Sequence, residues 1–145
     1  MGPAYKREAA LVNSLRTVAI HEAGHAVIAA ALGIKVEGIA LDSNSGRVRT
    51  RCPEQNISEI ERSLIVTLAG PIAERLLIGD PSDESVFRGD RKDEIELTAK
   101  MAEQVGLFEA DLRALDCERR ATSLVFAKRK EIQILADRLM LKKVA

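Results

Sequence analysis

A histidine pair near the N-terminus carries the clearest chemical signal in the sequence. His21 and His25 lie four residues apart, and Glu22 directly follows the first of them. Positions i and i+4 share one face of an α-helix, so both imidazoles can bind the same metal ion. Glu22 lies about 100° around the helix from His21, close enough to reach a water on that metal. The pattern is typical of zinc hydrolases, in which the metal activates a water and the glutamate is the general base.

The apolar segments 17–20 and 26–32 predict that this motif lies on a helix, which Gly33 would end as a C-terminal cap. The helix is apolar on nearly every face, so it is expected to be a core element. The alternative is that both histidines are ordinary packed core residues. Burying two imidazoles and a carboxylate without partners is costly, whereas a metal satisfies all three, so we favour metal binding.

The third metal ligand must be Asp, Glu or Cys, because the chain has no other histidine. The acidic stretch 89–96 stands where a helix is predicted to begin, over about 92–105. A carboxylate in the first turn of that helix would project from a fixed backbone. The alternative is that these acids only complement the helix dipole.

Four segments resemble, in order, the peptidase domain of FtsH-type AAA+ proteases. Residues 18–26 look like its zinc-binding helix, and 68–74 are similar to its glycine-rich helix. Residues 93–102 resemble the helix that carries its third ligand, an aspartate, and 130–139 resemble its final helix. Together the matches span roughly 16–142. The resemblance implies a zinc peptidase that acts on flexible or unfolded polypeptides.

Two alignments with the family place the third ligand differently. Asp93 keeps the family's residue type, whereas Glu94 restores the position of the following isoleucine, Ile95. Both stay candidates, with Asp93 slightly favoured. Glu74 is, by the same resemblance, an acceptor for the remaining N–H of a ligand histidine. A solvated helix face shared with Arg75 is an equally good interpretation of Glu74.

Nothing in the sequence resembles a P-loop or an ATPase module, and no apolar run is long enough to cross a membrane. We therefore expect a stand-alone peptidase domain over residues 1–145 that does not unfold its substrates by ATP hydrolysis. The segment after Val105 is shorter than in the family, so access to the zinc is expected to be more open. A homo-oligomer or a separate unfoldase stays open as a partner.

Composition agrees with one small domain. The chain has 145 residues, 46% of them hydrophobic, and Lys plus Arg equals Asp plus Glu at 22 each. No strong field therefore favours nucleic acid or an anionic membrane. The two cysteines, Cys52 and Cys117, suggest neither a disulfide framework nor a cysteine zinc cluster. No signal peptide opens the sequence, so we expect a cytoplasmic protein.

The fold is expected to be mostly α: a compact helical zincin-type domain with a small β-hairpin after the zinc-binding helix. Strands at 36–41 and 47–51 flank a turn-rich stretch. Val48 and Thr50 alternate with arginines, as a half-exposed edge strand would. We hypothesise that substrate backbone pairs with this strand. An edge without a partner is the alternative.

The remaining elements are predicted to be helices. One runs over about 58–78, with Ser58 and Glu61 as its capping box and Pro71 causing a kink. The region 110–142 forms one helix or two. Its predicted buried stripe is Leu112, Leu115, Leu124, Val125, Ile132, Leu135 and Leu139.

The sequence thus predicts a zinc-dependent metalloendopeptidase. Zn2+ would be held by His21, His25 and either Asp93 or Glu94, and Glu22 would move the proton from water to the leaving amine. The alternative is a catalytically weak, peptidase-like module that binds or regulates other proteins. A purely structural zinc site is less well supported, because it needs a fourth protein ligand and leaves Glu22 unexplained.

Overall fold

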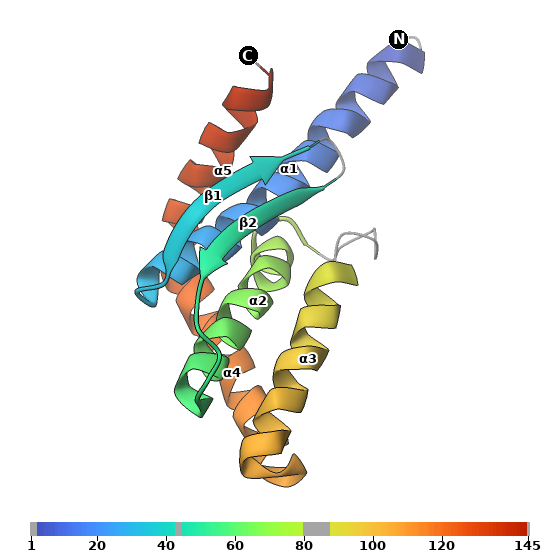
Figure 1. The fold of residues 1–145 in the computed structure, drawn as a ribbon. Coiled ribbons are helices and arrows are strands. Elements are labelled where there is room, and N and C mark those ends of the chain that lie inside the picture. The colour runs from blue at the N-terminus through green and yellow to red at the C-terminus, as the bar shows by residue number, and fades with distance from the viewer. Residues whose placement is uncertain (1–2, 43–44, 80–87, 145) are drawn as a thin grey trace.

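The computed structural model describes residues 3–42, 45–79 and 88–144, and the side chains of residues 14–42, 45–79 and 90–142. This part of the chain is mostly helical with one two-stranded antiparallel hairpin, which confirms the predicted fold class (Figure 1). The elements are α1 (Pro3–Ala31), β1 (Lys35–Leu41), β2 (Gly46–Arg51), α2 (Ile57–Leu77), α3 (Arg88–Val105), α4 (Leu107–Ala127) and α5 (Arg129–Val144).

Helix α1 is longer than predicted, because it begins at Pro3, well before the apolar run that predicts it. Its C-terminal half is buried, as expected for a core helix. Beyond its last turn Gly33 has a positive φ of 75°, a conformation that glycine adopts without steric cost. The N–H of Ile34 donates to the carbonyl of Ala29 over 2.9 Å, which ends the helix.

The hairpin forms where the sequence predicts it and lies across α1 (Figure 1). Its register pairs Ile39 with Val48, and an irregularity lies between Val36 and Gly38. Val48 is half-buried as predicted, whereas Thr50 is exposed, so the predicted alternation holds only near the start of β2.

Helix α2 begins one residue earlier than predicted, and Ser58 is not its cap. The side chain of Asn56 accepts a 2.9 Å hydrogen bond from the N–H of Glu59, the usual role of an N-cap residue. Glu61, assigned by the sequence to a capping box, instead pairs with Arg113 of α4 at 2.9 Å. The helix continues through Pro71 to Leu77.

The C-terminal region forms two helices, which meet at Lys128. The predicted buried stripe is correct for Val125, Ile132 and Leu139. It is wrong for Leu112 and Leu115, which are 49% and 58% exposed. The inner face of α4 instead carries smaller side chains, because α4 packs closely on α2: the buried residues are Ala110, Cys117, Ala121 and Val125.

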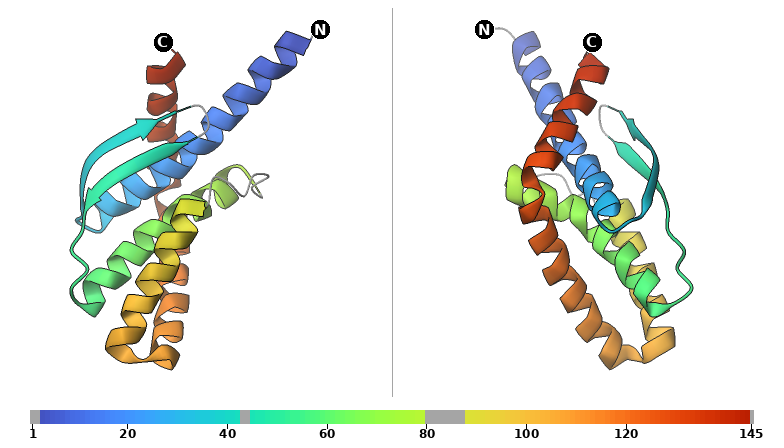
Figure 2. Two further views of the ribbon diagram at one scale, coloured as in Figure 1. Left: turned by 45° about the vertical axis from the view of Figure 1, so that its right-hand side comes forward. Right: turned by 90° about the vertical axis from the view of Figure 1, so that its left-hand side faces the viewer.

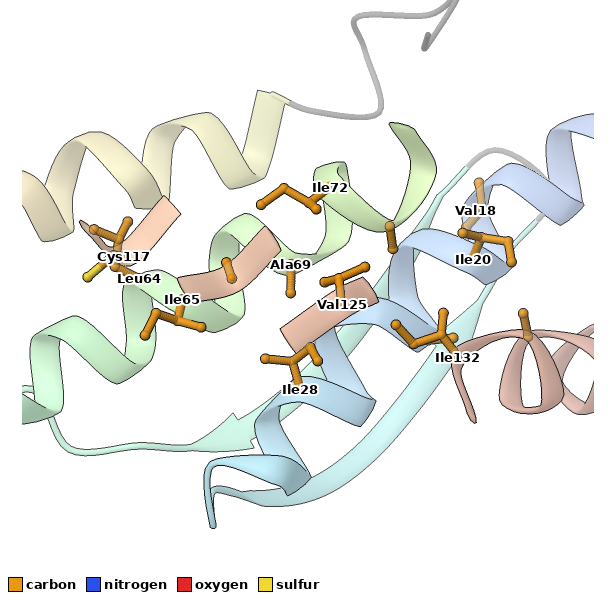
Figure 3. Close-up of a cluster of buried hydrophobic side chains, with 14 of the residues drawn as sticks. Val18, Ile20, Ile28, Leu64, Ile65, Ala69, Ile72, Cys117, Val125 and Ile132 are labelled. Carbon is orange, nitrogen blue, oxygen red and sulfur yellow. The ribbon is translucent and has the colours of Figure 1, made fainter. Parts of the chain in front are cut away.

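Helix α2 lies at the centre and contacts α1, α3 and α4 (Figure 2). Apolar side chains of all five described helices form the core, including Leu97 and Met101 of α3. Figure 3 shows Ile28 of α1, Ile65 and Ala69 of α2, Val125 of α4 and Ile132 of α5. This core fixes α1, which carries the histidine motif, against α2. Within the described ranges, none of the helices combines the length and apolarity needed to span a bilayer.

Candidate metal centre

Small residues allow α1 and α2 to approach closely at the histidine motif. A Cβ atom added to Gly24 of α1 would lie 2.8 Å from the Cβ of Ala73 and 2.9 Å from the carbonyl oxygen of Ala69. Real Cβ atoms do not approach so closely, since protein interiors are packed as densely as organic crystals. The glycine that the sequence places inside a helix therefore marks a helix–helix contact.

Gly70 of α2 provides the space that the two imidazoles occupy. A Cβ atom at Gly70 would lie 2.5 Å from Nε2 of His25 and 2.8 Å from Nε2 of His21. Any larger residue at this position would force the rings out of place. The glycine is therefore part of the site, although it carries no functional group.

Both histidines are buried, and their Nε2 atoms face each other at 3.1 Å. Nδ1 of His25 lies 2.7 Å from the carbonyl oxygen of Val66, to which it donates. Nδ1 of His21 lies 3.5 Å from a carboxylate oxygen of Glu74. With the Nδ1 atoms held in this way, each Nε2 is directed toward a common point, as in metal-ligating histidines.

Glu74 is only 1% exposed, so the interpretation of a solvated helix face is wrong for this residue. The Glu74 carboxylate belongs to α2 and faces Nδ1 of His21, on the side of the ring opposite Nε2. A carboxylate in this position orients a ligand imidazole and raises its basicity.

Asp90, in the first turn of α3, completes the group of converging atoms. Its Oδ2 lies 3.2 Å from Nε2 of His25 and also pairs closely with Nε2 of His21. In a tetrahedral zinc site with bonds near 2.0 Å, neighbouring ligand atoms are about 3.3 Å apart. Two of the three separations, 3.1 Å and 3.2 Å, are close to that value, whereas Asp90 and His21 are in closer, direct contact. Two imidazoles and a carboxylate are a donor set that suits zinc.

The structure brings Asp90, and neither Asp93 nor Glu94, to the histidine pair. Both of the latter residues are exposed; Asp93 borders a small cavity of about 210 Å³ beside Lys100, and Glu94 lies one turn beyond Asp90. The reason is the start of α3, which begins at Arg88, four residues before the predicted start. Asp90 thereby takes the first-turn position, and Glu94 is about 6 Å further along the same face.

Glu22 is buried beside the ligand atoms. Its Oε1 lies 4.0 Å from Nε2 of His21, and it forms with the two histidines a group whose ligand atoms lie within 4.8 Å of one another. A Cβ atom at Gly46, the first residue of β2, would lie 2.5 Å from Cγ of Glu22. The start of the edge strand therefore passes directly over the predicted general base.

Burial and charge adjust the acidity of these groups. Burial raises the pKa of Glu22, and the two histidines only partly offset that effect. Burial alone would lower the pKa of His21, but hydrogen bonds and charges from Asp90 and Glu74 outweigh it and raise the pKa to about 10. Burial would raise the pKa of Asp90, but its bonds to both histidines hold it well below its usual value. His21 therefore holds a proton at neutral pH that a metal must displace.

A cavity of about 700 Å³ opens next to Asp90, between α2, α3 and α4. Its volume is in the range of small-molecule and peptide side-chain sites. Apolar residues form much of its wall: Leu68, Pro71, Ile95, Ala99, Ala102 and Leu107. Arg75 and Arg91 also border the cavity, as do Glu94 and Asp111.

Two comparisons with known proteins indicate the class of this domain. A family model described as Peptidase M50B-like matches residues 7–78, which include both histidines, Glu22 and Gly70. An ATP-dependent zinc metalloprotease FtsH from Mycoplasma mobile is 31% identical over 115 residues, covering 73% of this chain. The match spans 16% of that relative's length. The chain therefore contains a zinc metallopeptidase-like domain.

Proposed function

We propose that this domain is an FtsH-type zinc-dependent endopeptidase that hydrolyses flexible or unfolded polypeptides. The observation that carries the proposal is the convergence of three ligand atoms, from His21, His25 and Asp90, on one point beside Gly70. The similarity to a zinc metalloprotease FtsH supports it. The proposed reaction adds water across a peptide bond.

His21, His25 and Asp90 would hold the zinc, with Asp90 in the place that the sequence assigned to Asp93 or Glu94. Two histidines and one carboxylate are a common ligand set of catalytic zinc and leave one position for water. The ion, when bound, would lower the pKa of that water toward 7 and polarise the substrate carbonyl.

Glu22 would act as the general base. Its Oε1 lies 4.0 Å from Nε2 of His21, farther than the roughly 3.3 Å expected between two ligand atoms of a tetrahedral zinc. This distance suits a base beside the metal better than a ligand. Because burial raises its pKa, the carboxylate is a stronger base than an exposed glutamate. Glu22 would accept the proton from the attacking water and then donate it to the nitrogen of the leaving amine.

Substrate backbone would align along β2. This strand pairs with β1 on one side, and its first residue, Gly46, touches Glu22. A peptide that added a strand along β2 would therefore pass the general base in an extended conformation. This requirement favours unfolded segments, because folded proteins seldom expose an extended chain. A proline at Arg49 should slow cleavage without changing the melting temperature by more than a few degrees; cleavage unaffected by Arg49→Pro would remove β2 from the proposal.

The cavity beside Asp90 would receive an apolar side chain of the substrate. Its apolar wall includes Leu68, Ile95 and Leu107, and it opens next to the proposed metal ligand. A peptide held on β2 with its scissile bond at the metal could place a neighbouring side chain there. Large apolar residues near the cleaved bond are therefore the expected preference.

The ligand set is tested by zinc stoichiometry and affinity in metal-free buffer refilled with zinc. The wild type should bind one zinc ion per chain, and Asp90→Ala should lose it. Asp93→Ala and Glu94→Ala serve as matched controls, since they remove a neighbouring carboxylate from the same helix. If one of those two variants loses zinc and Asp90→Ala keeps it, the assignment of Asp90 is wrong.

The reaction is tested by cleavage of a fluorescently labelled, unfolded polypeptide. Glu22→Gln should abolish cleavage and retain zinc, because glutamine keeps the shape of the side chain without its basicity. Zinc binding without any cleavage that depends on Glu22 would overturn the proposed peptidase activity. That result would favour the binding or regulatory module instead.

A further inference from the structure

Helix α3 carries the proposed third ligand but is held by few buried side chains. Of its described side chains, from Asp90 to Val105, only Leu97 and Met101 are buried. Both lie within about 20° of the direction of Asp90 around the helix, because steps of seven and eleven residues nearly complete whole turns. In Figure 1, α3 stands at the edge of the bundle beside α2. Core packing therefore holds α3 along one narrow line.

A cavity lies on each side of this line. The larger one, of about 700 Å³, borders Ile95 and Ala102 of α3, and the smaller one, of about 210 Å³, borders Glu96 and Lys100. Packing therefore offers little resistance to rotation of α3 about its own axis. A rotation of about 20° would move a carboxylate about 5 Å from that axis by about 2 Å, far more than the tolerance of about 0.2 Å in metal–ligand distances.

Polar contacts from Glu54 hold α3 on the side of the smaller cavity. Glu54 lies in the linker between β2 and α2. Its Oε1 accepts a 3.3 Å hydrogen bond from the hydroxyl of Ser63 on α2, and its Oε2 accepts a 2.6 Å hydrogen bond from Nζ of Lys100 on α3. Ser63 is buried, so the α2 end of this chain of contacts is fixed. We call Glu54, Ser63 and Lys100 the Glu54 network.

A second contact joins α3 to the same linker. Nε2 of Gln104 donates a 3.1 Å hydrogen bond to the carbonyl oxygen of Gln55. Gln104 lies one turn beyond Lys100, so α3 is attached at two points on one side, and two points resist rotation better than one. Lys100 is ten residues from Asp90, about 15 Å along the helix, and a continuous helix transmits rotation over that distance.

We propose that Glu54 is a positioning residue of the metal centre. By holding Lys100 of α3 against Ser63 of α2, Glu54 fixes the rotation of α3 and hence the place of the Asp90 carboxylate beside the two histidines. The inference rests on the proposed function, because it takes Asp90 as a metal ligand. Glu54 would act on zinc binding only through Asp90.

The first test is zinc affinity, measured by competition with a chelator. Glu54→Gln and Lys100→Gln should each lower the affinity about 10-fold, the lower end of the effect of residues that orient ligands directly. Lys100→Arg keeps the charge and should retain most of the affinity. Arg51→Gln is the matched control, because it removes a positive charge from another 2.6 Å ion pair, with Glu37 of the hairpin, and it should bind zinc as the wild type does.

The sign of the Lys100→Gln effect distinguishes positioning from simple electrostatics. Removing a positive charge favours the binding of a cation, whereas loss of positioning weakens it. Combined with Asp90→Ala, Lys100→Gln should cause no further loss of the residual affinity, measured at higher zinc concentration, because its effect passes through Asp90.

Hydrogen exchange of the metal-free protein tests α3 itself. Lys100→Gln should exchange the amides of α3 about threefold faster than the wild type, as expected for loss of one exposed ion pair, and should leave those of α5 unchanged. The melting temperature should change by no more than a few degrees, since exposed ion pairs contribute little to overall stability.

The outcomes separate this inference from the proposed function. If Asp90→Ala keeps zinc, the proposed ligand set fails and the inference fails with it. If Asp90→Ala loses zinc while Glu54→Gln and Lys100→Gln bind it as the wild type does, only the positioning role is overturned. A further loss when Lys100→Gln is added to Asp90→Ala, or unchanged exchange in α3, would also overturn that role.

Discussion

The two sides of α2 differ in how closely their neighbours pack. On the side of α1, Gly24, Ala69, Gly70 and Ala73 bring the two helices together with no space for a further methyl group. On the side of α3 and α4, a cavity of about 700 Å³ remains, lined by larger side chains such as Leu68. Helix α2 therefore packs tightly on α1 on one side and borders an open cavity on the other.

The difference separates two requirements of a metallopeptidase. Metal ligands must be held to a fraction of an ångström, and backbone packed against backbone gives that precision. A substrate side chain instead needs volume that the protein leaves unfilled. The open side of α2 offers such a volume, lined in part by apolar side chains.

Adding a methyl group at the tight contact between α1 and α2 should have the largest effect on zinc affinity. Gly70→Ala would place a methyl group 2.5 Å from Nε2 of His25, so the rings must move apart. Zinc affinity, measured by competition with a chelator, should fall more than about 100-fold, beyond the usual effect of residues that only orient a ligand. Gly38→Ala is the control, because its methyl group would meet only the flexible end of Arg49, and it should keep the wild-type affinity. Unchanged zinc binding in Gly70→Ala would show that the site is less confined than described.

Weakening the contact that orients His21, without adding volume, should lower zinc affinity by a smaller factor. Glu74→Gln keeps the size of the side chain but removes the charge that faces Nδ1 of His21. Zinc affinity should fall by about 10- to 100-fold, as it does when carboxylate partners of ligand histidines are lost. Arg75→Gln, at the neighbouring exposed position, should leave the affinity unchanged. Equal affinities for the Glu74 variant and the wild type would limit Glu74 to a packing role.

Filling the open side should change selectivity and leave zinc binding intact. Ala99→Phe would occupy part of the cavity wall on α3. Cleavage of peptides with large apolar residues near the scissile bond should fall by about tenfold in kcat/KM, while peptides with small residues should be affected less. Ala31→Phe, exposed at the end of α1, is the matched control. Equal losses for both peptide classes would place the substrate side chain elsewhere.

A separate prediction concerns the pH dependence of stability in the metal-free protein. The pKa of His21 is raised from 6.5 to about 10, so the folded state holds this proton more tightly than the unfolded state. The contribution is fully present below pH 6.5 and is lost as the pH rises through about 10. The melting temperature should therefore fall over this interval. Zinc-loaded protein should lack this fall, because a ligand histidine carries no proton on the metal-binding nitrogen.

Asp90→Asn is the control for the pH effect, since it removes the first carboxylate partner of His21 and should flatten the curve. A melting temperature of the metal-free wild type that rises or stays level from pH 6.5 to 10 would contradict the assigned protonation of His21.

The sequence predicted those parts of the site that depend on local spacing. His21, Glu22 and His25 share a helix because their neighbours are apolar, and the hairpin follows from alternation and a turn-rich stretch. The third converging carboxylate was not predicted, because it depends on where α3 begins. Asp90 belongs to the acidic stretch 89–96 that the sequence analysis singled out. Its position directly after Gly89, near a helix start, was the signal that could have identified it as the third carboxylate.

The faces of α4 show another limit of hydrophobic periodicity. Leu112 and Leu115 are more hydrophobic than Ala110 and Ala121, so the sequence pattern favoured the wrong face as the buried one. The small residues are buried because α2 lies too close for larger ones. That distance is a tertiary property, which no local pattern contains.

The converging atoms at the site come from distant parts of the chain, since 65 residues separate His25 from Asp90. An ion held there would cross-link α1 to α3 through bonds that exist only in the folded chain. Its binding free energy would therefore add to that of folding, by about 2.7 kcal/mol when free zinc is 100 times its dissociation constant. Zinc supply would then set how long the protein survives as well as whether it acts.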